Sequence, residues 1–243
     1  MGVIEVKNFR KSFGSKVVHK DVNFYVRKGE CLGLIGGSGV GKSVLLRSLI
    51  GLEKPDSGQV LIEDEDITRM NEQELTRIRK KVAYAFQGGA LFDSMTVFEN
   101  LAYPLREHTS LNESEIRKKI ISQLAEFGLS QSESLFPASL SGGMQKRVGL
   151  ARAMIMGPQV ILYDEPTAGL DPFNTKRIQE VILKLKSQGV TAILVTHDMP
   201  TALAVCDKMA FLKDGCVVAQ WTIEQLHRES TGIIHQFMNG EIA

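Results

Sequence analysis

The stretch GGSGVGKS, from Gly36 to Ser43, combines residue types that bind phosphate. It fits the pattern G-x-x-x-x-G-K-[ST] and lies between a strand-like run and a helix-like run, as this pattern requires. Its glycines allow several backbone N–H groups to converge on one anion. Lys42 would neutralise the β- and γ-phosphates of a nucleotide, and the Ser43 hydroxyl would bind Mg²⁺. The residues that we expect to contact the nucleotide here are Gly36, Gly37, Ser38, Gly39, Val40, Gly41, Lys42, Ser43 and Val44.

Two carboxylates, Asp164 and Glu165, follow one another at the end of the apolar run VILYDEP. In an open α/β sheet, ligands bind beyond the carboxyl ends of the strands, so both side chains would face a ligand there. Asp164 could bind Mg²⁺, and Glu165 could orient or deprotonate an attacking water, as phosphoryl transfer to water requires. Alone, the pair could be an exposed strand end. Together with the phosphate-binding stretch, it predicts a site that hydrolyses a nucleotide.

Three further residues are candidates for this site because of their places relative to strands. His197 follows the run AILVT, which we expect beside the strand that ends at Asp164, so its imidazole could reach a γ-phosphate. Gln87 ends the run KVAYAF, where its amide could sense Mg²⁺ and the attacking water. Phe13 could stack on a nucleobase, since stacking tolerates any base. The structural alternatives are polar strand ends for His197 and Gln87 and a core aromatic for Phe13.

A second glycine-rich stretch, SLSGGMQKRV at residues 139–148, indicates a turn that runs into a helix. The start of a helix presents free backbone N–H groups and the positive end of the helix dipole, so it also suits phosphate. The chain therefore contains two features that could bind phosphate, far apart in the sequence.

Short apolar runs alternate with helical runs over much of the chain, which predicts an α/β fold. Asp171 followed by Pro172 predicts the start of a helix, with an N-cap and then proline at the first helical position. Residues 208–220 predict a hairpin that turns at Asp214 and Gly215. The other predicted elements are a helix at 42–52 and strands at 3–6, 22–26, 31–36, 58–62, 81–86, 160–164 and 191–196.

The region from Gly88 to Ala153 contains no convincing strand. It includes a long amphipathic run at 112–129, which Asn112 and Glu115 would open as a capping box. We therefore predict an inserted helical subdomain. The predicted division is a nucleotide-binding core with an antiparallel β part at 1–87 and 154–220, the helical subdomain at 88–153, and a helical tail at 221–243.

The composition is that of an ordinary globular protein: 243 residues, 43% hydrophobic and 23% charged, with a formal net charge of +1. A nearly balanced charge gives no basic footprint for nucleic acid, so we expect no nucleic-acid partner. No apolar run approaches the ~20 residues of a membrane span, and the N-terminus lacks the apolar core of a signal peptide. The three cysteines show no metal-binding spacing, so we predict buried thiols.

The complete set of motifs, in this order, resembles that of the ABC ATPases over residues 3–220. This resemblance implies a P-loop NTPase fold with a mainly parallel sheet, ATP and Mg²⁺ as cofactors, and ATP hydrolysis that involves Lys42, Gln87, Glu165 and His197. It assigns Mg²⁺ to Ser43, Gln87 and Asp164. The matching motifs are GGSGVGKS, Gln87, LSGGM at 140–144, VILYDE at 160–165, AGLD at 168–171 and His197.

The resemblance also implies a role for the second glycine-rich stretch. In this family, two subunits pack head to tail, and the helix that begins at this motif caps the ATP held by the other subunit. Ser141, Gly142 and Gly143 are then expected to contact a γ-phosphate in the second copy, and Asp171 is expected at the seam. A symmetric homodimer makes two such composite sites.

Within this family, three segments most resemble the ATPases of Mla/Mce-type lipid transporters: residues 86–107, 141–153 and 234–241. The resemblance implies phospholipid transport between membranes, a separate integral membrane permease, an accessory subunit at the C-terminal tail, and a peripheral place on the cytoplasmic face of the inner membrane. The alternatives are an ABC ATPase of an amino-acid importer, a lipoprotein-release complex or a cell-division complex, or a soluble ABC protein of DNA repair or translation.

A permease partner has a physical reason of its own, because a chain that hydrolyses ATP in this way offers no pathway for cargo. The helical subdomain carries apolar residues directly after Gln87, and we predict that about half of them form a groove for a cytoplasmic helix of the permease while the others pack internally. These residues are Leu91, Phe92, Val97, Phe98 and Leu101.

Overall fold

The computed structural model describes residues 2–228, 232 and 236–237. Its strands are β1 (Ile4–Phe13), β2 (Lys16–Val26), β3 (Cys31–Ile35), β4 (Ser57–Ile62), β5 (Glu65–Asp66), β6 (Val82–Ala85), β7 (Val160–Asp164), β8 (Thr191–Val195), β9 (Lys208–Lys213) and β10 (Cys216–Thr222). Its helices are α1 (Lys42–Ser48), α2 (Glu72–Lys81), α3 (Val97–His108), α4 (Glu113–Glu126), α5 (Gly142–Met154), α6 (Pro172–Ser187), α7 (Met199–Val205) and α8 (Ile223–Arg228), with 3-10 turns at Ile67–Arg69 and Pro137–Ser139.

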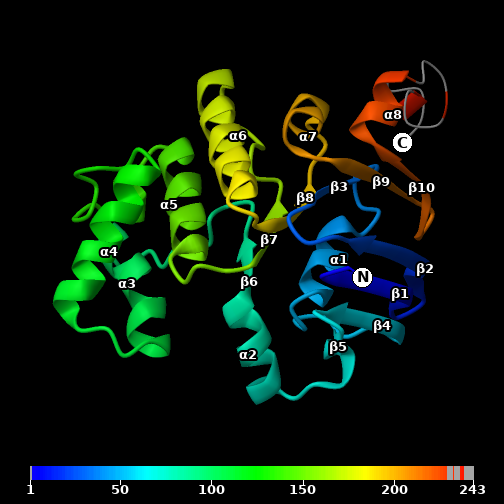
Figure 1. The fold of residues 1–243 in the computed structure, drawn as a ribbon, viewed down its shortest axis with the longest axis horizontal. Coiled ribbons are helices and arrows are strands. Elements are labelled where there is room, and N and C mark those ends of the chain that lie inside the picture. Colours follow the sequence, from blue (N-terminus) through cyan, green and yellow to red (C-terminus); the bar gives the residue numbers. More distant parts are fainter. Residues whose placement is uncertain (1, 229–231, 233–235, 238–243) are drawn as a thin grey trace.

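The strands of the described residues form one ten-stranded sheet in the order β5-β4-β1-β2-β10-β9-β3-β8-β7-β6 (Figure 1). The five strands β9, β3, β8, β7 and β6 run parallel to one another. The pairs β1–β2, β1–β4, β4–β5 and β9–β10 are antiparallel. The predicted α/β class, a mainly parallel core joined to an N-terminal antiparallel part, is confirmed.

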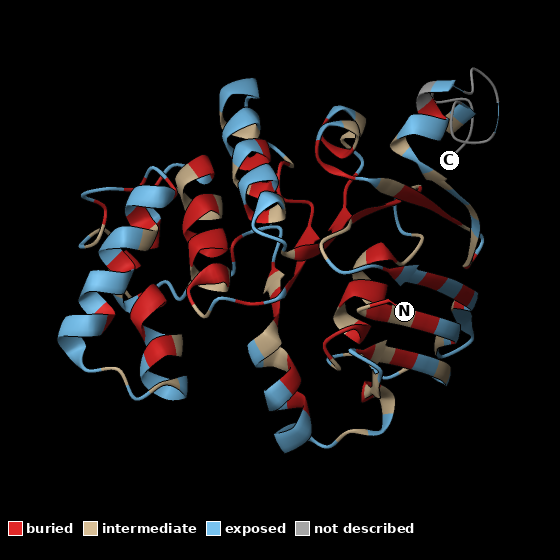
Figure 2. Ribbon diagram, viewed as in Figure 1, coloured by how far each residue is buried: buried red, intermediate tan, exposed pale blue. Residues whose placement is uncertain are grey.

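The central strands β3, β7 and β8 are buried along their whole length (Figure 2). Their sequences CLGLI, VILYD and TAILV are nearly continuous apolar runs, as expected for parallel strands that helices cover on both faces. One face packs against α1 and α2, and the other packs against α5, α6 and the helices beyond them. This packing holds the carboxyl ends of the three strands at one edge of the sheet.

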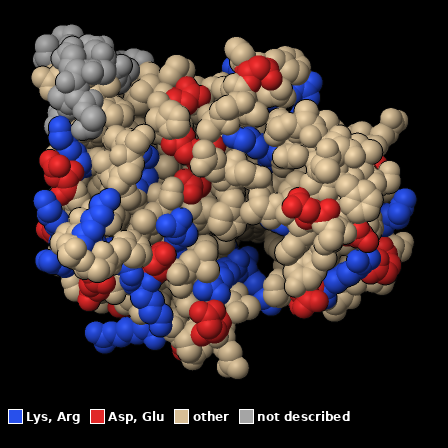
Figure 3. Space-filling model, turned by 180° about the vertical axis from the view of Figure 1, so that it is seen from behind, with Lys and Arg blue, Asp and Glu red and all other residues tan. Residues whose placement is uncertain are grey.

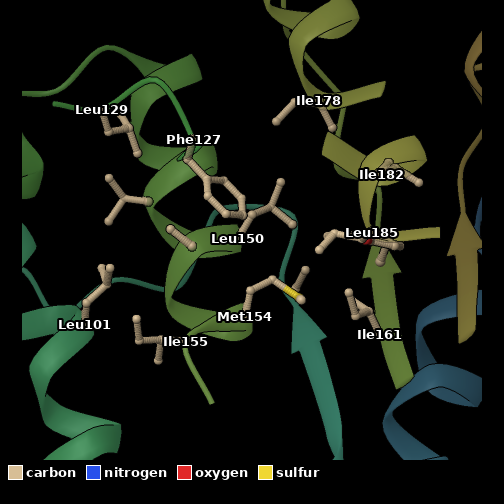
Figure 4. Close-up of a cluster of buried hydrophobic side chains, with 14 of the residues drawn as sticks. Leu101, Phe127, Leu129, Leu150, Met154, Ile155, Ile161, Ile178, Ile182 and Leu185 are labelled. Atoms are coloured by element: carbon tan, nitrogen blue, oxygen red, sulfur yellow. The ribbon is translucent and has the colours of Figure 1, made fainter. Parts of the chain in front are cut away.

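The helices α3, α4 and α5 follow β6 and share a core with α6 and the sheet. Figure 4 shows Leu150 and Met154 of α5 between the α3–α4 side and the side chains of Ile161, Ile182 and Leu185. No strand occurs between residues 88 and 153, all of which the structure describes, and the capping box of Asn112 and Glu115 opens α4 as predicted. Whether these helices make an independent subdomain stays a prediction.

Several element bounds differ from the prediction. The strands β1 and β2 are much longer than the predicted 3–6 and 22–26, because polar residues alternate with buried ones along a sheet face that water reaches. The first helix ends at Ser48 rather than at 52, since Gly51 has a φ of 68°. Residues 221–222 belong to β10 and not to the helical tail, and helix α2 was missed entirely.

The hairpin of β9 and β10 turns at Asp214 and Gly215 as predicted, and both residues have positive φ. The three cysteines are unpaired, and Cys31 and Cys206 are buried. Among the residues that the structure describes, no helix has the length and apolar character to cross a membrane. Most of the segment 234–241, on which the tail prediction rests, lies outside the described residues.

Candidate functional site

The loop between β3 and α1 has a backbone that only glycine allows at two positions. A Cβ on Gly36 would lie 2.3 Å from the carbonyl oxygen of Leu212. Gly41 has a φ of 99°, and a Cβ there would lie 2.4 Å from Cγ1 of Val18. A side chain at either place would force the loop apart, so these glycines allow its backbone to curl tightly before α1.

The Lys42 side chain lies inside this loop. Its Nζ donates hydrogen bonds to the carbonyl oxygens of Gly36 at 2.8 Å and Gly37 at 2.9 Å. Burial lowers the pKa of the Lys42 ammonium, while the nearby carboxylates of Glu165 and Asp164 act in the opposite direction. The positive charge is therefore held at the centre of the loop with the two acidic residues close enough to influence it.

Asp164, at the end of β7, is buried and accepts hydrogen bonds at both carboxylate oxygens. The Ser43 hydroxyl donates to Oδ1 at 2.8 Å, and the Tyr84 hydroxyl donates to Oδ2 at 2.7 Å. The structure thus brings together Ser43 and Asp164, as the sequence predicted. It adds Tyr84, which the sequence analysis missed; burial and the Asp164 carboxylate raise the pKa of this phenol well above its usual range. The only hint in the sequence was a tyrosine hydroxyl within the otherwise apolar strand VAYA.

Glu165 and His197 also come together. Glu165 is a non-glycine residue with a φ of 51°, and its N–H donates to the carbonyl oxygen of Val195 at 2.9 Å, which ties it to the end of β8. Its Oε1 lies 2.7 Å from Nδ1 of His197. The strained backbone at Glu165 is the kind of feature that clusters at functional sites. The carboxyl ends of β7 and β8 therefore present a paired carboxylate and imidazole.

His19, on β2, contacts the loop between β3 and α1, and the sequence analysis missed this residue. Its Nε2 lies 3.2 Å from the carbonyl oxygen of Gly41, and its ring packs edge-on against Phe9 with centroids 5.5 Å apart. The ring is fully buried, and its Nδ1 has no hydrogen-bond partner among the residues that the structure describes. Burial lowers the pKa of His19. A histidine in a strand far from any motif gives no sequence signal for such a role.

The second glycine-rich stretch begins helix α5, as predicted. Ser141 is its N-cap, with Oγ accepting a hydrogen bond from the N–H of Met144 at 3.3 Å. Ser141 and Gly142 are exposed, whereas Gly143 is buried. Within the described residues, no hydrogen bond or ion pair joins these residues to the loop around Lys42 of the same chain. The helix start is open to a ligand or a partner.

Phe13 and Gln87 are both exposed. Phe13 ends β1 with 45% of its surface accessible, and the Lys11 ammonium lies 4.9 Å from its ring centroid. The alternative of a core aromatic is therefore wrong. Gln87 follows the end of β6 by two residues, and its side chain makes no hydrogen bond within the described part of the chain. The structure leaves both side chains accessible and does not join either to the loop.

A groove of about 560 Å³ lies between α2 and β6 on one side and α3 and α5 on the other. Figure 3 shows it as a hollow that Lys and Arg side chains border. Of the apolar residues predicted for it, Phe92 is exposed and lines the groove, Val97 and Leu101 are buried, and Leu91 and Phe98 pack partly against the core. The lining includes Tyr84, Phe86, Phe92, Tyr103, Arg79, Lys80 and Arg152, and no acidic residue.

The chain is similar to known ATP-binding proteins of transporters. Residues 19–168 match the family model described as ABC transporter. The chain is 45% identical over 99% of its length to the probable ribonucleotide transport ATP-binding protein mkl of Mycobacterium leprae, of which the match covers 70%. It is 38% identical over 98% of its length to the intermembrane phospholipid transport system ATP-binding protein MlaF of Haemophilus influenzae, of which the match covers 91%.

A solved structure is similar over most of this chain. The dimeric ATP-binding cassette MJ0796, in a post-hydrolysis state bound to ADP and Pi, superimposes with a TM-score of 0.85 at 33% identity, covering 90% of this chain and 98% of that one.

Proposed function

Because this chain belongs to the ABC transporter family, we propose that it is the ATP-hydrolysing subunit of a transporter that moves phospholipid between membranes. As a member of this family, the chain binds and hydrolyses ATP. The observation that carries the phospholipid assignment is the match to MlaF, which spans nearly the whole of both chains. The resemblance of residues 86–107 to the lipid-transport ATPases supports the same assignment.

The chemistry that we propose uses the groups gathered at the sheet edge. The loop N–H groups and Lys42 bind the phosphates, and Phe13 offers an exposed ring for the base. Glu165 accepts a proton from the attacking water, and His197, held against it, orients that carboxylate and faces the γ-phosphate. The paired carboxylate and imidazole are close enough to work as a unit.

The oxygen groups around Asp164 fit Mg²⁺, which prefers carboxylate, hydroxyl and phosphate oxygens. Ser43 and Asp164 already lie within hydrogen-bond distance of one another, so both could bind one ion, with Gln87 as the third candidate. The ion would neutralise the phosphates. Within the described residues, no group of three or more His, Cys, Asp or Glu side chains is placed to hold a metal, so phosphate oxygens would have to complete the coordination.

We propose a head-to-tail homodimer as the working form. Ser141 and Gly142 are exposed at the start of α5, where free N–H groups and the helix dipole favour an anion, yet this helix start has no bond to the loop of its own chain. A second copy would bring its ATP to them. Phe173, directly after Asp171 and Pro172, is the most exposed large apolar residue among those described, at 65%, which fits a place near the seam.

The groove is the proposed seat of a permease helix. Its aromatic lining and its basic rim call for an amphipathic helix with acidic residues at its edge, since Lys80 and Arg152 form no ion pair within the described residues, whereas Arg79 pairs with Glu72. Such a partner would place the chain peripherally on the cytoplasmic face of the inner membrane. An accessory subunit at the tail remains part of the proposal, although most of that tail lies outside the described residues.

Ribonucleotide transport is a second candidate, favoured by the higher identity to mkl. The two can be separated by purifying the chain with the membrane subunits that it retains and reconstituting the complex in vesicles. We expect ATP-dependent movement of fluorescent phospholipid, absent with Glu165→Gln. ATP-dependent uptake of labelled ribonucleotide without lipid movement would replace the phospholipid assignment by the second candidate.

A further inference from the structure

The aromatic ring of Tyr84 lies between the groove and the nucleotide site. Its hydroxyl donates to Oδ2 of Asp164 at 2.7 Å, while Ser43 binds the other oxygen of the same carboxylate. Its ring lines the groove. Among the residues described, it is the groove residue that hydrogen-bonds to Asp164. One side chain therefore belongs to both places.

A second aromatic extends this connection toward the groove. Phe86 is two residues along from Tyr84, so both point to the same side of the chain where β6 ends. Their rings pack with centroids 4.3 Å apart and planes tilted by 35°. Phe86 is 41% exposed and lines the groove. A molecule bound in the groove would contact Phe86. Because the Phe86 and Tyr84 rings pack together, a displacement of Phe86 would displace the Tyr84 ring.

A displacement of Tyr84 would change the hydrogen bond that holds the Asp164 carboxylate. This carboxylate is buried at the end of β7, and the two hydroxyl groups fix both of its oxygens. Groups that hydrogen-bond to a metal-binding carboxylate set its orientation and strengthen its binding. We propose that Tyr84 is a positioning residue that orients Asp164 for the metal and links this orientation to the groove through Phe86. The link to a permease rests on the proposed function; the orientation of Asp164 does not.

The orientation can be tested on the full chain alone, without hydrolysis. In a Glu165→Gln background, the binding of a fluorescent ATP analogue is measured as Mg²⁺ is raised, and again in EDTA. Tyr84→Phe keeps the ring and removes the hydroxyl. We expect it to raise the Mg²⁺ concentration needed for tight binding about tenfold, with the affinity in EDTA unchanged. An unchanged Mg²⁺ requirement would overturn the proposal, and so would an equal loss in EDTA, which indicates a structural defect.

The matched control is Tyr103→Phe. Tyr103 lines the same groove and is 45% exposed, and its hydroxyl makes no hydrogen bond to Asp164. It should leave the Mg²⁺ requirement as it is. A shift equal to that of Tyr84→Phe would show that any change in the groove has this effect and would overturn the specific role of Tyr84.

The link to the groove is tested with a second pair of variants. Phe86→Ala removes the ring against Tyr84, whereas Phe92→Ala removes another exposed groove aromatic, one that packs on Tyr103 at 5.5 Å. We expect Phe86→Ala to raise the Mg²⁺ requirement in the same assay and Phe92→Ala to leave it unchanged. If both or neither raise it, Phe86 does not carry the link. Because no permease is present, this result stands apart from the failure or success of the transport assay.

Discussion

Glu165 and His197 are held face to face, with Oε1 of the carboxylate 2.7 Å from Nδ1 of the imidazole. The carboxylate is largely buried, with 12% of its side chain accessible, while 66% of the imidazole is accessible. A ring that donates from Nδ1 to a carboxylate turns its Nε2 outward. The pair therefore offers a carboxylate on the inside and a second ring nitrogen on the exposed side.

This arrangement makes Glu165→Gln the most direct test of the proposed chemistry. The amide cannot accept a proton from water, so hydrolysis should fall by a factor of about 10²–10⁴. ATP binding should persist, since the loop and Lys42 are unchanged. The unhydrolysed ATP should then hold two copies of the chain together as a dimer. Phosphate release and size-exclusion chromatography with ATP check both parts. Turnover at the rate of the unchanged chain would show that Glu165 is not the base.

Lys42→Ala should abolish tight ATP binding. The ammonium lies inside the loop, and charge-assisted hydrogen bonds to two phosphates are worth about 1.5–3 kcal/mol each, so the affinity should fall at least a hundredfold. Titration of a fluorescent ATP analogue measures the loss. The variant also removes the bonds to the carbonyls of Gly36 and Gly37, so thermal unfolding without nucleotide serves as the control. Wild-type affinity in a stable Lys42→Ala variant would contradict the assignment of the loop.

The buried His19 should make the chain less stable in mild acid. Burial lowers the pKa of His19 below its ordinary value of 6.5, so below about that pH the unfolded chain binds a proton that the folded chain resists. Its contribution to the free energy of unfolding is full above pH 6.5 and is lost as the pH falls through the lowered pKa. Urea unfolding without nucleotide at pH 7.5, 6.5 and 5.5 should show this loss.

His19→Gln is the comparison for that series. Its amide can still donate to the carbonyl oxygen of Gly41, but it does not titrate. We expect a flatter dependence of unfolding free energy on pH between 7.5 and 5.5. The carboxylates with lowered pKa values, such as Glu5 and Asp66, act at more acidic pH and remain in both proteins. Parallel pH curves for the two proteins would rule out His19 as the source.

The sequence predicted those site residues whose position follows from local backbone geometry or from standing at the carboxyl end of a buried strand. The glycine pattern around Lys42 is dictated by local geometry, and buried strands place Asp164, Glu165 and His197 at one edge. Tyr84 could not be found this way, because its partner lies 80 residues away and contact requires β6 and β7 to be neighbours. The same limit applies to His19.

Helix α2 shows a different limit. Its capping box of Asn71 and Glu74 was present in the sequence, but the run from Glu72 to Lys81 buries only Leu75 and Ile78. Two apolar residues on one face give a weak periodic signal. Packing against the sheet decides the structure here, and packing cannot be read from so polar a run. The helix matters because it makes one wall of the groove.

The groove predicts different outcomes for two phenylalanines that the sequence treats alike. Phe92 is 44% exposed in the groove, so Phe92→Glu should leave the chain folded and weaken its copurification with membrane subunits. Phe98 is half-buried against the core, so Phe98→Glu should lower the melting temperature, because the variant loses apolar packing. Affinity purification and thermal unfolding separate these effects. Full retention of the membrane subunits by Phe92→Glu would argue against this groove as their seat.

Two glycines of the loop between β3 and α1 allow the cost of backbone strain to be separated from the cost of crowding. Gly39 and Gly41 have positive φ values of 76° and 99°, but a Cβ on Gly39 meets nothing within 4 Å, whereas one on Gly41 would lie 2.4 Å from Val18. Alanine at Gly39 should cost about 1–2 kcal/mol from its φ alone. Alanine at Gly41 should cost about 1–3 kcal/mol more, because the side chain must displace Val18 and His19. Urea unfolding without nucleotide measures both variants, and equal losses would show that the loop can move away from β2 without cost.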